Sequence, residues 1–217
     1  QSGEFVGACK HVGPGDQETL KIELISDEAV KTSEIEGEIL DRASVQSSVR
    51  QQLGLGQEQP GVKPAERGIS QMMADLYRSY ATPLTEKVLF DWHAMLVGGD
   101  KSIQTIGGYR RHADPMQVVS GPDHKRKVHF EAPPSALVPS EMKRFIAWFN
   151  STAPGGKSPL PALTRAGIAH LYFVCIHPFE DGNGRIGRAL AEKSLAQNLG
   201  QPSLIALAYT IERKRKD

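Results

Sequence analysis

Residues 177–188 read His-Pro-Phe-Glu-Asp-Gly-Asn-Gly-Arg-Ile-Gly-Arg. This short stretch combines a base, His177, with a carboxylate, Asp181, and two arginines. Histidine accepts a proton near neutral pH, and a carboxylate is the usual protein ligand of Mg²⁺. Arg185 and Arg188 are three residues apart, so on a helix they share one face and can point at the same anion. These residue types together predict a site that handles a nucleoside triphosphate.

The residues between the carboxylate and the arginines, Gly182, Asn183 and Gly184, predict a tight turn that opens a helix. Glycine tolerates positive φ and lets an anion approach the backbone closely. The backbone N–H groups of such a turn can point at phosphate oxygens. The same glycines would suit an ordinary helix-starting turn, but the flanking histidine and arginines favour ATP binding by this turn and by both arginines.

All fixed positions of the pattern His-Pro-Phe-x-x-Gly-Asn-Gly-Arg-x-x-Arg are matched at residues 177–188, and the chain therefore resembles the Fic/Doc family. The resemblance implies an enzyme that moves AMP from ATP to a hydroxyl side chain (Ser, Thr or Tyr) of a target protein. It implies that His177 is the general base that takes the proton from that hydroxyl, and that Arg188 holds the γ-phosphate. It also implies that Asp181, rather than its neighbour Glu180, is the ligand of Mg²⁺.

Four other side chains around the motif are interpreted from their positions. Pro178 is expected to shape the loop and Phe179 to anchor it in the core. Glu180 is expected to be a solvated loop acid. Tyr172 lies about one and a half helical turns before His177, so it either lines the nucleotide pocket or packs as a core aromatic residue.

The spacing of apolar residues predicts an all-α fold with one small β-hairpin. The expected helices cover residues 26–36, 44–53, 65–80, 83–97, 140–150, 162–176 and 183–198, and a last helix starts near residue 203. Ser26, Thr82 and Ser140 are expected to be N-caps, because a hydroxyl can accept a bond from a free N–H of the first turn. Residues 162–176 are apolar nearly all round, which predicts a buried central helix.

Two short β-prone runs, Met116–Val119 and Lys127–Phe130, predict a hairpin with a long loop. Arg110 precedes it, after two glycines and a tyrosine. The resemblance implies that this hairpin is the flap over the active site, where an unknown target protein docks as an added strand. A purely structural hairpin is the alternative.

The residues from Thr32 to Gly37 match the inhibitory pattern Ser/Thr-x-x-x-Glu-Gly/Asn of self-inhibited Fic proteins. The resemblance implies that Glu36 pairs with Arg188 and so competes with the γ-phosphate, while Thr32 lies one turn earlier on the same helix face. The predicted domains are an N-terminal region, residues 1–60, with the inhibitory helix at about 27–37, and a Fic catalytic domain, residues 61–217.

The bulk properties restrict the class of protein. A length of 217 residues with 39% hydrophobic content fits a medium domain with an appendage, and a net charge of +1 gives no reason to expect nucleic acid or membrane as a partner. No apolar run reaches transmembrane length. Cys9 and Cys175 are far apart and lack metal-ligand spacing, and Cys175 is expected to be a buried thiol. These cysteines suit a reducing compartment, so we expect a cytoplasmic protein.

Other functions remain open from the sequence. The same site could remove AMP, with Glu36 orienting a water molecule. A non-enzymatic alternative is a regulatory binding module that responds to nucleotide, with a DNA-binding domain beyond the C-terminus, although the intact His177 argues against it. Fic proteins often dimerise, so a homodimer is among the expected states. The chain lacks an initiating methionine and ends on an uncapped helical sequence, and we expect it to be a fragment.

Overall fold

The fold is that of a computed structural model, which describes residues 13–120, 127–202 and 207–214. Contacts divide the chain into two compact units. The first runs from Gln1 to Ala74 and includes Leu204–Asp217, and the second runs from Asp75 to Ser203. The domain boundary near residue 60 stays a prediction, because the helix that follows it crosses from one unit into the other.

The first unit is built from helices α2 (Pro14–Ile35), α3 (Arg42–Gln52), the start of α4 (Pro64–Ser79) and α9 (Leu207–Lys214). Helix α2 packs against both α3 and α9. The buried apolar residues of α2 recur at helical spacing and are Ile22, Ile25 and Ala29. Those of α3 are Val45 and Val49. The carboxylate of Glu28 accepts the N–H of Ala208 at 2.9 Å, so an acid of α2 caps the start of α9.

The predicted N-cap at Ser26 is wrong, because α2 begins at Pro14 and runs through this position. The Ser26 hydroxyl is buried and donates to the carbonyl of Ile22 at 2.7 Å instead of accepting a backbone N–H. The C-terminal end agrees with the expectation: α2 ends at Ile35, and Gly37 follows with φ of +84°.

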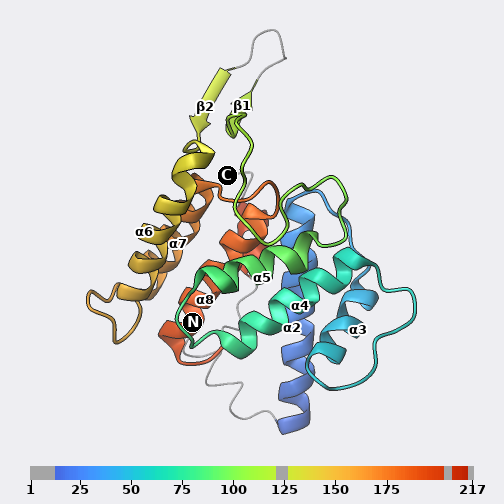
Figure 1. The fold of residues 1–217 in the computed structure, drawn as a ribbon. Coiled ribbons are helices and arrows are strands. Elements are labelled where there is room, and N and C mark those ends of the chain that lie inside the picture. The colour runs from blue at the N-terminus through green and yellow to red at the C-terminus, as the bar shows by residue number, and fades with distance from the viewer. Residues whose placement is uncertain (1–12, 121–126, 203–206, 215–217) are drawn as a thin grey trace. The chain divides into compact units, whose positions relative to one another are not determined.

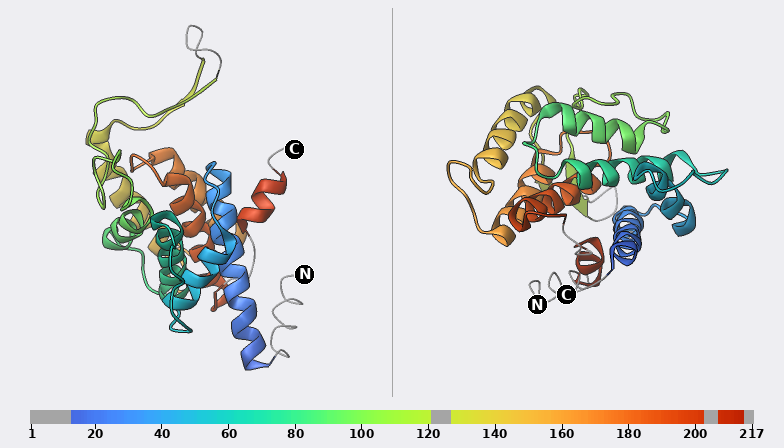
Figure 2. Two further views of the ribbon diagram at one scale, coloured as in Figure 1. Left: turned by 90° about the vertical axis from the view of Figure 1, so that its right-hand side faces the viewer. Right: turned by 90° about the horizontal axis from the view of Figure 1, so that it is seen from below.

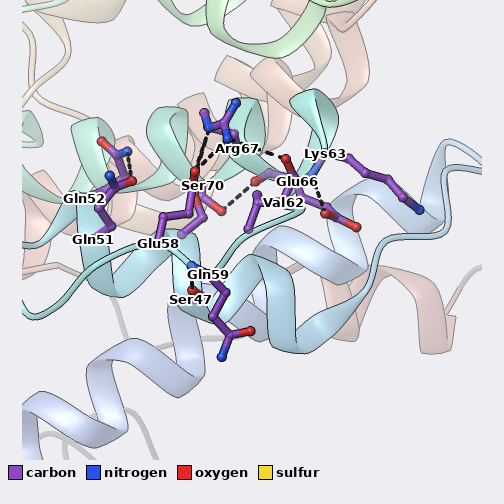
Figure 3. A network of polar contacts seen from close by, with 11 residues as sticks. Ser47, Gln51, Gln52, Glu58, Gln59, Val62, Lys63, Glu66, Arg67 and Ser70 are labelled. Atoms are coloured by element: carbon purple, nitrogen blue, oxygen red, sulfur yellow. Dashed lines mark hydrogen bonds and ion pairs between the residues drawn. The ribbon is translucent and has the colours of Figure 1, made fainter.

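A polar network fixes the linker between α3 and α4 (Figure 3). Arg67 makes a two-pronged contact with Glu58, with its Nη2 at 2.6 Å and its Nε at 3.0 Å from Oε2. Glu66 accepts the N–H of Lys63 at 2.8 Å and that of Asp41 at 3.2 Å. Glycine and proline therefore mark a linker that is held in one conformation by side-chain acceptors.

The second unit holds the remaining helices and the hairpin (Figure 1). Its elements are α5 (Glu86–Val97), β1 (Gln117–Ser120), β2 (Lys127–Glu131), η2 (Ser135–Leu137), α6 (Val138–Ser151), α7 (Ala162–Ile176) and α8 (Asn183–Leu199). Strands β1 and β2 pair antiparallel, with an irregular register between Val118 and Val119. The hairpin projects away from these helices, as the left view of Figure 2 also shows. The predicted fold class, mostly helical with one small hairpin, is confirmed.

Two further predicted N-caps are wrong in the same way as Ser26. Helix α5 begins at Glu86 and is capped by Thr85, which accepts the N–H of Val88, while Thr82 donates to the carbonyl of Ser79 at 2.7 Å. Helix α6 begins at Val138, and Ser140 donates to the carbonyl of Leu137 at 2.8 Å. The predicted start of the last helix near residue 203 lies outside the described residues.

Helix α7 packs against α8 and α6 but is not the fully buried helix that its composition predicts. Leu163 is 79% exposed and Leu171 is 64% exposed, because neighbours cover only one side of the helix. Cys175 is half-buried rather than buried, and Cys9 lies outside the described residues. The contact with α8 is close at Gly187, where an added Cβ would lie 3.0 Å from Val174 and 3.1 Å from His170.

Two glycine substitutions should therefore change stability in opposite directions. We expect Gly187→Ala to lower the free energy of unfolding by about 1–2 kcal/mol, because α7 and α8 must move apart. Gly167→Ala should raise it by about 0.5–1 kcal/mol, since this helical position of α7 has open space for a Cβ. Urea unfolding of both variants measures the difference. A stabilised Gly187→Ala protein would contradict the close packing.

Candidate functional site

The motif loop begins where His177 ends helix α7 in a left-handed conformation, with φ of 51° and ψ of 60°. Among the described residues it is the only non-glycine with positive φ. Its N–H still donates to the carbonyl of Phe173 at 3.1 Å, so the turn closes the helix and redirects the chain in a single residue. Such a conformation costs on the order of 1–3 kcal/mol outside glycine and is concentrated at functional sites.

The side chain of Asn183 holds the loop closed from within. Its Oδ1 accepts the N–H of Phe179 at 3.0 Å, and its Nδ2 donates to the carbonyl of Phe179 at 2.8 Å. Asn183 is buried, and its amide is engaged within the loop. Any contact between Asn183 and phosphate would therefore come from its backbone N–H, and its predicted part in ATP binding stays a prediction.

Phe179 anchors the loop, as expected, and Pro178 beside it is buried. The Phe179 ring is fully buried and stacks on the imidazole of His93, with ring centroids 4.2 Å apart. Phe173 and Tyr109 pack against it at 6.2 and 5.9 Å. Burial of an aromatic ring on this scale offsets the cost of the strained turn.

Helix α8 starts directly after the loop. Gly182 is its N-cap with φ of 80°, and no side chain caps the first turn there. An unblocked helix N-terminus suits an anion, because its N–H groups and the positive end of the helix dipole face outward. Gly184 lies in that first turn, so the predicted anion-binding turn is a real turn at a helix start.

The two motif arginines belong to α8 and are both buried, Arg185 at 7% exposure and Arg188 at 5%. Arg185 donates to the carboxylate of Asp181 at 2.9 Å. A buried guanidinium keeps its charge and binds anions more strongly than an exposed one. The loop and the first turns of α8 thus bring together the predicted base, carboxylate, turn and arginines, although their roles with a ligand stay predictions.

Asp181 is the residue that fits a Mg²⁺ ion. Its side chain is 55% exposed, and one of its oxygens already holds Arg185. Within the described residues no group of three or more His, Cys, Asp and Glu side chains is gathered for a metal. Mg²⁺ is commonly held by one or two carboxylates together with substrate phosphates, so a single exposed carboxylate beside an anion-binding turn is a suitable donor set.

Tyr172 lies outside this loop. Its ring packs edge-on against Phe145, with centroids 5.3 Å apart, and near Trp148 at 5.9 Å. It also lines a hollow of about 430 Å³ at the base of β2, together with Phe130 and Ile176. Tyr172 therefore packs among aromatic rings and borders this hollow, and its predicted contact with the nucleotide stays a prediction.

Three residues contribute to the site in ways that the sequence did not indicate. Glu180 is no solvated acid, because its carboxylate accepts the N–H groups of Gln104 and Thr105. Arg110 is 2% exposed and donates from Nε to the carbonyl of His177 at 2.7 Å. His93 is fully buried, and its Nδ1 accepts the N–H of Gly107 at 3.1 Å. Only Arg110 carried a signal, as the residue that follows two glycines and a tyrosine.

In the first unit, the predicted inhibitory residues lie at the end of α2. Thr32 is buried, and Glu36 is the exposed C-cap residue. Glu36 and Arg188 belong to different units, so their pairing stays a prediction.

Comparison with known proteins identifies the second unit. The model of the Fic/DOC family matches residues 83–195, which is more than half of the chain. The chain belongs to the Fic/DOC family. Residues 1–55 match a domain of unknown function, DUF4172.

Curated relatives in the family include adenylyltransferases. A probable protein adenylyltransferase of Aquifex aeolicus is 33% identical over 69 residues, which are 32% of this chain and 20% of the relative. The protein adenylyltransferase Fic of Drosophila melanogaster is 42% identical over 64 residues, which are 30% of this chain and 12% of the relative. The matches thus span a fifth or less of the relatives' length.

Solved structures agree in fold. A Fic family protein from Desulfovibrio desulfuricans aligns over all of this chain and 61% of its own, with a TM-score of 0.70 and 23% identity. A Fic domain containing signaling protein from Bacteroides thetaiotaomicron aligns over 88% of this chain and 69% of its own, with a TM-score of 0.68 and 21% identity. None of the helices in the described ranges has the length and apolar character needed to cross a membrane.

The buried histidine beneath the motif loop should make stability depend on pH. Burial lowers the pKa of His93 from 6.5 to about 4, although Asp181 and Glu180 oppose the shift. Between these values the unfolded chain binds a proton that the folded chain does not, so the free energy of unfolding falls as pH drops and levels off below about 4. We expect His93 to contribute a loss of about 3 kcal/mol from about pH 7 to pH 4.

Urea unfolding across this pH range measures the effect, with His93→Asn as the comparison. The Asn Oδ1 can replace Nδ1 as acceptor for the N–H of Gly107, but it does not titrate. Equal pH dependence in the two proteins would show that the histidine is not held neutral.

Proposed function

We propose that this protein is an adenylyltransferase that moves AMP from ATP to a hydroxyl side chain of a target protein. The observation that carries the proposal is the arrangement around one loop. His177 is held in a strained turn at the end of α7, and the uncapped start of α8 follows with Asp181, Arg185 and Arg188 around it. Membership in the Fic/DOC family and the names of the matched relatives support the same activity.

In the proposed reaction, His177 takes the proton from the target hydroxyl as that oxygen attacks the α-phosphorus of ATP. A bond forms between the oxygen and phosphorus, the bond to the bridging oxygen breaks, and pyrophosphate leaves. The N–H groups at the start of α8 and the two buried arginines stabilise the negative charge on the phosphates. Asp181 would hold Mg²⁺, which neutralises phosphate charge when bound.

The target protein is proposed to dock on the hairpin. Every residue of β2 is exposed, so the pair of strands can accept an added segment through backbone hydrogen bonds. Val128 is 48% exposed and Phe130 39% exposed, which gives an added strand apolar side chains to pack on. Backbone pairing positions a segment with little demand on its sequence.

Regulation is proposed to come from Glu36. A bidentate pair between Glu36 and Arg188 would remove a γ-phosphate contact, and a charge-assisted pair of this kind is worth roughly 1.5–3 kcal/mol. Thr32 is buried one turn earlier on α2 and would fix the helix that presents Glu36. Such a pair would reduce the competent population by about one to two decades.

The activity is tested by incubating the protein with ATP, Mg²⁺ and lysate, then detecting AMP on proteins by mass spectrometry. His177→Ala should abolish transfer, since losing a general base typically costs about 10²–10⁴-fold in rate. Its affinity for ATP should stay within a few-fold, because the phosphate contacts belong to other residues. Chelating Mg²⁺ should also stop transfer. Loss of AMP from a modified protein, without any gain, would assign the site to AMP removal instead.

The inhibition is tested with Glu36→Gly, which should raise transfer roughly ten-fold or more because Arg188 becomes available to the γ-phosphate. Arg188→Ala should not activate, and the double variant should behave like Arg188→Ala alone, since the two groups share one partner. Glu38→Gly, an acid beyond the same helix end, is the matched control. Equal rates for wild type and Glu36→Gly across ATP concentrations would refute inhibition by this residue.

A further inference from the structure

The motif loop is bonded along its length to a segment far away in sequence, residues 104–110, which we call the strap. The strap lies between α5 and the hairpin. At one end, the N–H groups of Gln104 and Thr105 donate to Glu180 at 2.9 and 3.1 Å. At the other end, the N–H of Arg110 donates to the carbonyl of Pro178 at 2.9 Å. Both ends of the strap are therefore hydrogen-bonded to the loop.

The middle of the strap is fixed through the aromatic anchor. Gly107 has φ of +67° and donates to His93, whose ring stacks on Phe179. Tyr109 packs against the same Phe179 ring. An added side chain at Gly107 would meet the carbonyl of Phe90 at 3.5 Å, so the strap runs close to α5. The strap and loop thus share one packed aromatic core.

The guanidinium of Arg110 joins three parts of the second unit. It donates to the carbonyl of His177 at 2.7 Å, and a second N–H reaches the carbonyl of Ile176 at 3.5 Å. It also donates to the carbonyl of Pro133 at 2.5 Å and to the hydroxyl of Ser135 at 2.8 Å. Pro133 and Ser135 directly follow β2, so one buried cation links the backbone of the catalytic histidine to the base of the hairpin.

The position of this cation has a physical cause. The last carbonyls of α7 have no partner within the helix and form the negative end of its dipole. Arg110 supplies positive charge and donors to that end, and it does so at the residue with the strained left-handed backbone. Burial lowers the pKa of Arg110, yet guanidinium stays protonated at neutral pH.

Glu180 acts on the other end of the loop, next to Asp181. Each carboxylate oxygen accepts one strap N–H, an arrangement that an acceptor-only group satisfies fully. These two bonds hold the loop at Glu180 against the strap.

We propose that Arg110 and Glu180 are positioning residues that hold the two ends of the motif loop through the strap, Arg110 at His177 and Glu180 at Asp181. The proposal rests on the proposed function. Arg110 bonds both the carbonyl of His177 and the residues that follow β2, so it holds the base and the docking hairpin in one fixed geometry. A misplacement of about 1 Å at a catalytic group can cost about 10²-fold in rate.

Glu180→Gln is the sharpest test, because the amide keeps the shape but offers one acceptor oxygen and turns an NH₂ group toward the second strap N–H. We expect kcat to fall about ten- to hundred-fold, with the Kd for ATP within about three-fold and the thermal midpoint within a few degrees. Asp100→Asn is the matched control, since Asp100 accepts the N–H of Ser102 within its own turn and touches no motif residue. A kcat equal to that of wild type would overturn the part assigned to Glu180.

Arg110→Lys and Arg110→Met test the other end. Lysine keeps the charge and can reach part of the carbonyl set, so its kcat should lie between those of wild type and Arg110→Met. If Arg110→Met does not fold, the lysine variant alone decides: a lower kcat with a nearly unchanged Kd for ATP supports positioning. A loss of kcat that only follows the unfolded fraction would overturn it.

A readout without catalysis separates this proposal from the proposed function. By NMR, the amides of Gln104 and Thr105 should exchange slowly in wild type and at least ten-fold faster in Glu180→Gln. The imidazole resonances of His177 should shift in Arg110→Lys and stay unchanged in Asp100→Asn. If wild type transfers no AMP while the two variants show these changes, the proposed function is refuted and the positioning role of Arg110 and Glu180 is supported. Unchanged exchange and resonances refute the strap whatever the activity.

Discussion

The left-handed turn at His177 is the constraint on which the rest of the site depends. It ends α7, places the imidazole at the start of the loop, and sends the chain toward the N-terminus of α8. Its cost of on the order of 1–3 kcal/mol must be met elsewhere. The amide of Asn183 bonds both backbone groups of Phe179, and the Phe179 ring is fully buried, so the conformation is over-determined by its surroundings. Within this motif, Phe179 and Asn183 therefore serve to fix the backbone conformation of the loop.

The family and the local structure of the motif could be predicted from the sequence, because His177, the glycines and the arginines occur at fixed spacing. The positions at which helices begin could not be predicted from serine and threonine residues. Ser26, Thr82 and Ser140 were each expected to accept a backbone N–H, and each instead donates to a carbonyl three or four residues earlier. A hydroxyl does both equally well, so serine or threonine marks a start only when the backbone before it is already extended.

Burial was the other property that composition could not determine. Residues 162–176 contain few polar groups in any direction, yet α7 is covered only where α6 and α8 lie against it. The same limit applies to Glu180, whose neighbour in sequence is the exposed Asp181. Nothing local distinguishes a loop acid that binds water from one that accepts two N–H groups of a strap 76 and 75 residues earlier. Such roles come from long-range packing, which no periodicity encodes.

Three cations that sequence reasoning would place on the surface share one physical role in the second unit. Arg110 donates to the carbonyls of Ile176 and His177 at the end of α7, and Arg165 donates to Phe149 near the end of α6. Lys193 donates to Ser79 and Tyr80 at the end of α4. Burial lowers the pKa of Arg165 to about 10 and that of Lys193 to about 8.

Each of these cations donates to carbonyls at the C-terminal end of a helix, where the helix dipole is negative. These bonds compensate the cation for its lost hydration without a carboxylate contact. Glycines with positive φ end other helices locally, at Gly37, Gly54 and Gly200, but the ends of α4, α6 and α7 are completed by residues distant in sequence. These three helix ends are therefore satisfied only when the whole second unit is folded. The geometry of the motif loop, which lies at one of those termini, depends on the same cooperative packing.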